Sequence, residues 1–243
     1  MRYTDEMRRF VRVTGGLLVL AGVLTLGWAI TVWQWQDPFT ALYTHWQQGK
    51  LAHTLQKEVE AYTPAAPTGK AGDLAAERRA IAFDARRFQR QATIGQPIGR
   101  IVIGRIGLNM VLVNGTDHET LKKGPGRDPR SSMPGENRLV YIAGHRTTYL
   151  APFSAINDIR DGDYVRLEMP YGTFVYRTTH HRIVVATDMS VLRSPHHELL
   201  ELQACHPRFF ATHRYIVYAK LVSVIPRGMP PYQLEAAAIG TTG

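Results

Sequence analysis

The pattern of hydrophobic and polar positions changes sharply near the start of the chain. Residues 13–36 carry no charge and residues 13–33 are almost wholly apolar, a length that at ~1.5 Å per residue of helix crosses a bilayer. Four arginines lie in residues 1–12, and no Lys or Arg follows the apolar stretch until Lys50. This asymmetry predicts a cytoplasmic N-terminus. Because the stretch ends in Trp-Gln-Trp-Gln and not in small residues, we interpret it as an uncleaved transmembrane signal anchor.

Two helical segments follow the predicted anchor. Residues 37–63 have an approximately helical rhythm of apolar positions and begin with Asp-Pro, a helix-start signal. Residues 64–72 are rich in Pro, Ala and Gly and form a linker by composition. Asp73 is placed to cap a second helix that runs to about residue 92. Residues 37–92 therefore predict a helical stalk between the membrane and a globular domain.

Residues 93–225 have the pattern of an all-β domain. Short segments rich in Val and Ile alternate with turn signals about every eight to twelve residues, which is typical of a closed β-barrel or a sandwich. Short helical segments are expected at 117–123 and 152–156. Residues 226–243 predict a flexible tail. The expected strands are 97–106, 110–114, 139–143, 164–169 and 173–186, followed by two strands between 199 and 225.

The last two strands bring the candidate chemistry together. Apolar and polar residues alternate along the first of them, with Leu200, Leu202 and Ala204 on one face and Glu201, Gln203 and Cys205 on the other. Pro207 then interrupts the pattern, which resumes at Tyr215. If the two strands pair as a hairpin, Cys205 and Arg214 lie side by side, with Cβ atoms ~5 Å apart.

The net charge and the cysteine count limit the binding partners and the chemistry that the chain can have. The chain is 44% hydrophobic and carries a formal net charge of +9, but it has no zinc-finger spacing and no aromatic-basic motif typical of nucleic-acid binding. We interpret the charge as a basic surface near anionic lipid or wall polymer. The single cysteine, Cys205, excludes an intramolecular disulfide, and a lone extracytoplasmic thiol is a candidate reactive group.

A reactive cysteine needs partners. The nucleophile is the thiolate, which requires a base or a positive environment. Arg214 stays protonated and so cannot be the base, but it can donate hydrogen bonds to an oxyanion. A histidine must then move the proton. His145 follows a buried strand and a glycine, while His206 and His213 remain alternatives on chemistry alone.

Cys205 has two other possible interpretations, as an unreactive apolar residue or as a metal ligand. An isolated cysteine at a strand end is commonly a small hydrophobic residue. A zinc site formed by Cys205, His206 and His145 is formally conceivable, although no zinc-binding spacing supports it. The histidine pairs 180–181 and 196–197 are interpreted as surface residues, because neighbours on a strand point to opposite faces.

Six segments follow one another behind the predicted signal anchor: 98–110, 121–126, 142–149, 151–153, 205–208 and 214–217. In this order and spacing they resemble the sortases, and among them the class E sortases of high-GC Gram-positive bacteria. The resemblance implies an eight-stranded β-barrel with short helices over residues 93–225. It also implies a membrane-anchored cysteine transpeptidase whose nucleophile is Cys205, whose general acid/base is His145 and whose oxyanion stabiliser is Arg214.

The resemblance further implies the substrates. A C-terminal sorting signal on a secreted protein, of Leu-Ala-X-Thr-Gly or Leu-Pro-X-Thr-Gly type, is cleaved between Thr and Gly. The acyl group then passes to an amine of a cell-wall precursor resembling lipid II. No metal, organic cofactor or nucleic acid takes part. Expected substrate contacts are Thr147, Tyr149, Ala204 and His206.

The chain departs from the family pattern at two positions. Ala204 stands where sortases usually carry Thr before the cysteine, and Arg127 stands where related enzymes tend to have His after Gly-Pro-Gly. Two rival functions therefore stay open: a cysteine peptidase or thioesterase that releases its product to water, and a catalytically weak assembly module on the same fold.

Overall fold

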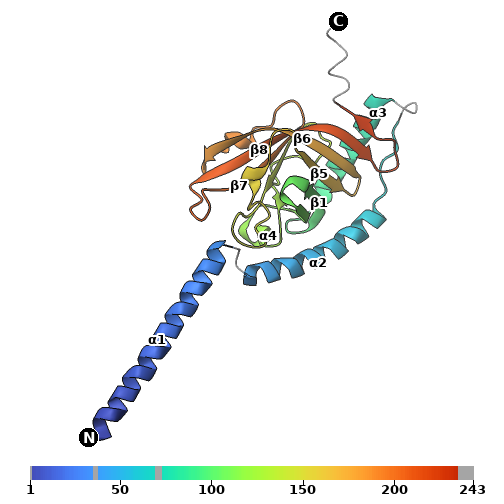
Figure 1. Cartoon of the computed structure of the whole chain (residues 1–243). Helices are drawn as coiled ribbons and strands as arrows, with labels where there is room; N and C mark the ends of the chain where they lie inside the picture. Colours follow the sequence, from blue (N-terminus) through green and yellow to red (C-terminus); the bar gives the residue numbers. More distant parts are fainter. Residues whose placement is uncertain (1, 35–37, 69–72, 235–243) are drawn as a thin grey trace. The chain divides into compact units, whose positions relative to one another are not determined.

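A computed structural model describes residues 2–34, 38–68 and 73–234 (Figure 1). The chain divides into two compact units, one ending at Phe39 and one beginning at Thr40. The first unit is dominated by helix α1 (Arg2–Gln34). Its segment Met7–Ile30 has a mean hydropathy of 2.0 and is long enough to cross a membrane, which agrees with an N-terminal anchor. Residues 35–36 of the predicted span lie outside the described residues.

The second unit is built on one β-sheet closed into a barrel. The strand order is β6-β5-β1-β2-β3-β4-β7-β8, and pairing of β6 with β8 closes the ring. The predicted eight-stranded barrel is therefore confirmed. The strands are β1 (Pro97–Ile103), β2 (Leu108–Asn114), β3 (Gly126–Arg127), β4 (Leu139–Ala143), β5 (Tyr164–Met169), β6 (Gly172–Val185), β7 (Leu199–His206) and β8 (His213–Pro226).

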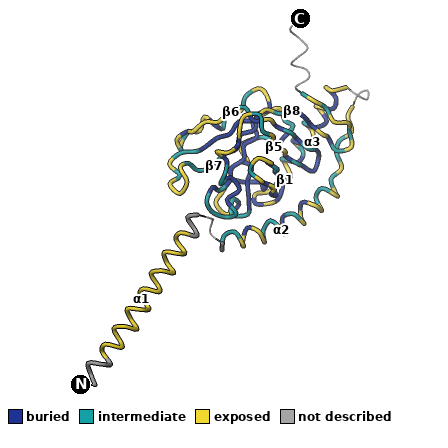
Figure 2. Tube along the Cα trace, viewed as in Figure 1, coloured by how far each residue is buried: buried dark blue, intermediate teal, exposed yellow. Residues whose placement is uncertain are grey.

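The inward-facing residues of the strands form the main core. Alternation along each strand sends every second side chain inward, and residues such as Ile101, Leu112, Phe174 and Leu202 are wholly buried. Figure 2 shows buried positions gathered along the strands, while α1 is exposed. Burial of each such side chain contributes ~1.5–3 kcal/mol. The connections carry one short α-helix and three 3₁₀ turns: α4 (His118–Leu121), η1 (Gly104–Ile106), η2 (Ile156–Asp158) and η3 (Met189–Leu192).

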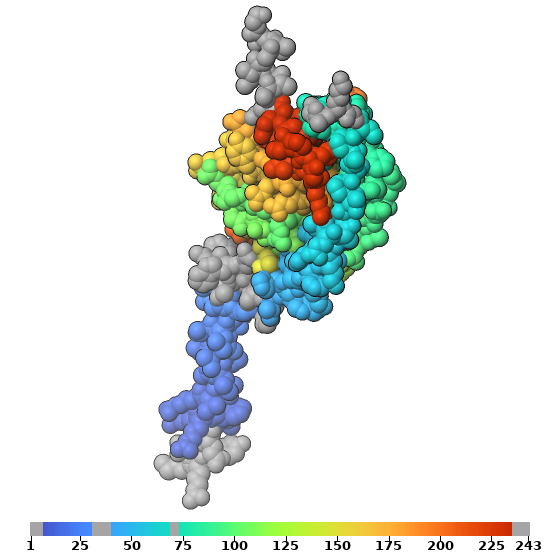
Figure 3. All heavy atoms as spheres, turned by 90° about the vertical axis from the view of Figure 1, so that its right-hand side faces the viewer, coloured from blue at the N-terminus to red at the C-terminus, as the bar shows by residue number. Residues whose placement is uncertain are grey.

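Two longer helices cover the barrel. In α2 (Pro38–Ala61), Leu51 and Leu55 pack against Val111 and Val113 of β2. Figure 3 shows α2 and α3, coloured light blue to teal, lying along the barrel surface beside the red C-terminal strands. This differs from the predicted stalk, because Leu51 and Leu55 of α2 are buried against the domain, whereas Leu42 and Trp46 nearer its start stay exposed.

Helix α3 (Leu74–Gln91) is part of the main core. Ile81, Ala85 and Phe88 are buried in it. The predicted cap is confirmed, since the Asp73 side chain accepts a hydrogen bond from the backbone N–H of Ala75. The folded domain therefore includes a helix that the sequence pattern assigned to the stalk.

The chain also stays with the barrel beyond residue 225, where the sequence predicted a flexible tail. The Arg227 backbone N–H donates to the carbonyl of Tyr171, and the Leu234 N–H donates to that of Val222. Strand β9 (Tyr232–Gln233) pairs with β8. The tail prediction is wrong for 226–234, and residues 235–243 lie outside the described residues.

Candidate active site

Strands β7 and β8 bring the thiol and the guanidinium together. They pair antiparallel with Cys205 directly opposite Arg214 and His206 opposite His213. The register expected from the sequence is thereby confirmed. Because opposite residues on an antiparallel pair share a face, the two side chains project to the same side of the sheet.

Cys205, His145 and Arg214 all line one groove with a volume of about 310 Å³. Strands β4, β7 and β8 form its floor, and the segment 186–192 with η3 forms one wall. Further lining comes from the loop after β3, the end of α4 and Thr116 before it, and the residues that follow β4. A histidine far from the cysteine in sequence therefore faces the same cavity, because β4 and β7 are parallel neighbours in the sheet.

His145 is held directly after β4 by close packing beneath it. A Cβ at Gly144 would lie 2.7 Å from the Phe153 ring, so glycine is needed for this approach. The Phe153 N–H donates to the His145 carbonyl at 3.0 Å. Burial, together with the nearby His118 and Lys122, lowers the pKa of His145 below its usual range. Neutral imidazole is therefore favoured near pH 7, ready to accept a proton.

Arg214 is fixed at the other side of the groove. Its Nη1 donates to the carbonyl of Ala211 at 2.7 Å and to that of His213 at 3.0 Å. A guanidinium has five N–H donors in a rigid plane, so two carbonyl contacts orient it without using all of them. The group can hold a developing oxyanion near the thiol.

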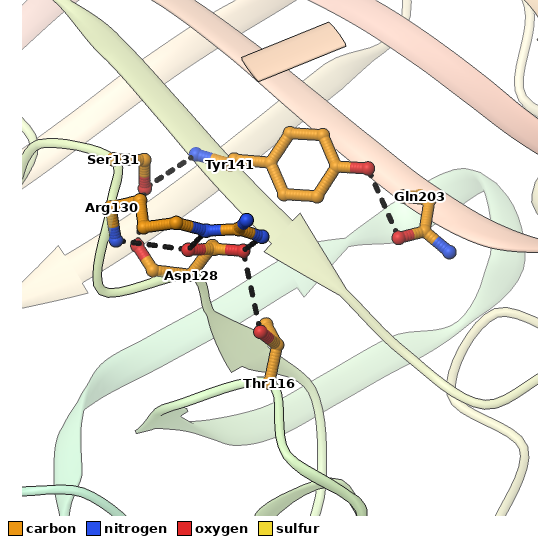
Figure 4. Close-up of polar contacts among 6 residues, drawn as sticks. All are labelled: Thr116, Asp128, Arg130, Ser131, Tyr141 and Gln203. Carbon is orange, nitrogen blue, oxygen red and sulfur yellow. Dashed lines mark hydrogen bonds and ion pairs between the residues drawn. The ribbon is translucent and has the colours of Figure 1, made fainter. Parts of the chain in front are cut away.

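The groove continues into a polar wall that the sequence analysis did not identify (Figure 4). The Tyr141 hydroxyl donates to Gln203 Oε1 at 3.0 Å. Asp128 is buried and pairs through both oxygens with Arg130, at 3.0 and 2.7 Å. Burial of the carboxyl opposes the Arg130 contacts, which lower the pKa of Asp128 below its usual range. Thr116 donates to the same carboxylate at 3.4 Å.

Alternation offered one sequence signal for this wall. Gln203 lies two residues before Cys205 on the same strand and so had to share its face. Asp128 and Arg130 lie in a loop without periodicity, and only the folded chain shows that they border the groove.

Arg127 supports that loop from inside. It is 2% exposed, and its guanidinium donates to Asn114 Oδ1 and to the carbonyl of Ser131. Burial lowers its pKa. The departure from the family pattern at this position thus has a structural use: Arg127 ties the loop that carries Asp128 to β2.

Arg146 is a second residue that the sequence analysis missed. Its Nη1 donates to the carbonyl of Cys205 at 3.1 Å and lies 3.0 Å from His206 Nδ1. Its Nη2 donates to Asn157 at 2.7 Å. Arg146, the residue after His145, therefore fixes the backbone at the nucleophile and links the segments that carry the histidine and the cysteine.

None of the four expected substrate contacts lines the groove. Ala204 is wholly buried in the main core, on the opposite face of β7 from the thiol, so its expected contact with substrate is not supported. His206 is engaged by Arg146. Thr147 is half-buried. Tyr149 lies against His145, with ring centroids 5.2 Å apart.

The geometry does not support the alternative of a zinc site formed by Cys205, His206 and His145. Over residues 2–34, 38–68 and 73–234, no group of three or more His, Cys, Asp or Glu side chains is arranged to hold a metal ion. Cys205 and His145 share the groove, while His206 is held by Arg146.

Comparison with known proteins places this geometry in a family. A sequence profile described as the sortase domain matches residues 101–222, about half of the chain. Sortase D of Bacillus subtilis (strain 168) is 35% identical over 133 residues, which cover 53% of this chain and 66% of that relative.

Two solved structures have the same barrel. Sortase E from Streptomyces avermitilis is 33% identical, covers 57% of this chain and 97% of its own, and superposes with a TM-score of 0.50. A Clostridium perfringens Sortase D5 transpeptidase is 23% identical, covers 72% and 98%, and has a TM-score of 0.58; at that identity the likeness concerns the fold alone. The chain belongs to the sortase family, a family of cysteine transpeptidases.

Proposed function

We propose that this chain is a membrane-anchored transpeptidase that cleaves a C-terminal sorting signal between Thr and Gly and transfers the acyl group to an amine. The observation that carries the proposal is the single groove lined by Cys205, His145 and Arg214. Family membership supports the reaction class. The roles of the three residues follow from their chemistry.

In the first half-reaction, neutral His145 accepts the thiol proton of Cys205. The sulfur attacks the Thr carbonyl carbon, a C–S bond forms, and the carbonyl electron pair moves to oxygen, where Arg214 donates hydrogen bonds to it. Collapse of this intermediate breaks the C–N bond. His145 returns the proton to the leaving glycine amine, and a thioester remains on Cys205.

In the second half-reaction, an amine of a cell-wall precursor attacks the thioester. His145 accepts its proton, the C–S bond breaks, and His145 passes the proton to the leaving sulfur, which restores the thiol and the neutral imidazole. Secreted proteins with C-terminal signals and a lipid II-like precursor are the proposed partners. Residues 1–12 are proposed to lie in the cytoplasm, residues 13–36 to span the membrane and the barrel to lie outside.

For the signal itself we favour Leu-Ala-X-Thr-Gly over Leu-Pro-X-Thr-Gly, and a host among high-GC Gram-positive bacteria. The similarity to sortase E from Streptomyces avermitilis supports this choice. Because the chain is also similar to Sortase D of Bacillus subtilis, both signals are included in the test. The buried position of Ala204 is a reason to expect that its missing hydroxyl leaves the groove intact.

A product assay tests the proposal. The purified chain is incubated with Leu-Ala-X-Thr-Gly and Leu-Pro-X-Thr-Gly peptides in the presence of an excess amine, and the products are separated by mass. We expect the peptide to be joined to the amine after Thr, with faster turnover of the Leu-Ala signal. Hydrolysed product alone would indicate the rival peptidase or thioesterase. No product, together with ordinary iodoacetamide reactivity of Cys205, would indicate the inert module.

A further inference from the structure

Helix α2 contacts the segment that follows His145. The Thr40 hydroxyl accepts a hydrogen bond from the Tyr149 backbone N–H at 3.1 Å. The Tyr43 ring meets the Tyr149 ring edge-on, with centroids 6.4 Å apart. Tyr149 in turn lies against the His145 ring at 5.2 Å. One turn of α2 is therefore connected to the imidazole through a single intermediate side chain.

The same helix holds the segment on the other side of His145. The Thr44 hydroxyl donates to the Lys122 carbonyl at 2.8 Å, and Gln48 donates to the Lys123 carbonyl at 2.7 Å. These carbonyls directly follow α4, which lies beside the start of α2 in Figure 1. Helix α4 carries His118, whose ring stands perpendicular to that of His145 at 6.4 Å. Both walls of the histidine are thus tied to α2.

These walls need support from outside. Tyr149, Leu150 and Ala151 have φ angles of 54°, 60° and 37°, and a run of non-glycine residues in this region persists only where the surrounding structure holds it. In addition, His145 Nε2 is buried without a hydrogen-bond partner, an arrangement that costs free energy. The contacts from Thr40, Tyr43 and Thr44 stabilise the conformation of both segments beside His145.

We propose that α2 is a positioning element for His145: through Tyr149 and the end of α4, it fixes the orientation of the imidazole and keeps water from it. The helix thereby does more than connect the anchor to the barrel. The positioning residues are Thr40, Tyr43 and Thr44, none of which touches the reacting atoms. The kinetic consequence rests on the proposed transpeptidase function, whereas the effect on the imidazole does not.

The titratable groups around His145 make the effect measurable. His118 and Lys122 face it from the α4 side, Tyr149 faces it from its own loop with Tyr43 behind, and Cys205 and Arg214 share the groove. Burial is the largest cause of the lowered His145 pKa. Opening the wall admits water and so raises this pKa toward its ordinary value.

The experiment compares the full chain in detergent micelles with the double variant Thr40→Val, Tyr43→Ala. Histidine NMR titration, assigned with His145→Gln, is expected to show a higher His145 pKa in the double variant. With a peptide substrate, kcat is expected to fall about 10- to 100-fold, the range that a small misplacement of a catalytic group produces, with little change in KM. Tyr43→Phe keeps the ring contact and is expected to behave as the unaltered chain.

Leu42→Ala is the matched control, because Leu42 lies on the same helix turn and is 71% exposed. It should change neither the titration nor kcat. An unchanged His145 pKa in the folded double variant overturns the proposal; if that variant does not fold, the same titration of Thr40→Val alone decides it. Because the titration needs no substrate, failure of the transpeptidase assay leaves this test intact.

Discussion

The two faces of strand β7 differ in what they contribute to the protein. On the inner face, Leu200 and Leu202 are wholly buried in the main core. On the outer face, Gln203 and Cys205 are half-buried and line the groove. The comparison teaches that a shift of one residue along this strand exchanges a stability function for a chemical one.

The outer face is itself divided. Two residues before Gln203, Glu201 is only 3% exposed. It lies between its strand partners Tyr141 and Tyr218, which belong with Val191 to a second apolar cluster. The sequence predicted a strand buried on one face only. That prediction is wrong at Glu201, since the segment containing η3 folds over the sheet there, and it holds at Cys205, where the groove opens.

Replacement of the nucleophile should have the largest effect on the chemical face. Cys205→Ala is expected to lower kcat/KM by about 10⁴-fold or more, because no other group on the chain can form the thioester. Stability should change by less than about 1 kcal/mol. Peptide kinetics and urea unfolding of the same preparation check both statements. Retained turnover in the variant would remove Cys205 from the mechanism.

Replacement on the core face should produce the converse. Leu202→Ala is expected to lower the free energy of unfolding by about 2–5 kcal/mol, through lost burial and a cavity. In the fraction that remains folded, kcat should stay near the original value. Urea unfolding followed by active-site titration measures the two separately, and a destabilisation below about 1 kcal/mol would show that this face is not tightly packed.

Arg214 tests whether the pairing across β7 and β8 is used in catalysis. Arg214→Gln is expected to lower kcat about 10²- to 10³-fold, the usual loss for an oxyanion donor, with KM much less affected. Arg177→Gln on β6, outside the groove, is the matched charge control. An equal loss in both variants would point to a general charge effect and not to oxyanion stabilisation.

Glu201 tests the covered end of the outer face through pH. Burial raises the pKa of Glu201 from about 4.5 to about 8, so the folded state holds this proton more tightly than the unfolded state does. Stability is therefore expected to fall as pH rises from about 4.5 to about 8, by up to ~1.4 kcal/mol per pH unit. Urea unfolding at several pH values should show this slope weakened in Glu201→Gln. Identical slopes would mean that Glu201 is solvated.

The sequence predicted those features that depend on local pattern. Alternation and the break at Pro207 were enough to predict that Cys205 pairs with Arg214. The preference of aspartate for the N-cap of a helix was enough to predict the cap at Asp73. The role of α2 was not predicted, because its rhythm shows that a face is apolar without showing what the face meets. Asp128 and Arg130 were missed for a related reason: only the parallel and antiparallel pairings around β3 and β4 bring their loop to the groove.

The central claim is that one groove unites a nucleophilic thiol, an imidazole and a guanidinium around a peptide carbonyl. Intact-mass spectrometry of the chain mixed with a Leu-Ala-X-Thr-Gly peptide, without any amine, tests it most directly. The account predicts an adduct equal to the peptide acylated through Thr, located on Cys205, removed by hydroxylamine and reduced in Arg214→Gln and His145→Gln. Cleavage of the peptide by Cys205→Ala, or an adduct on another residue, would contradict it.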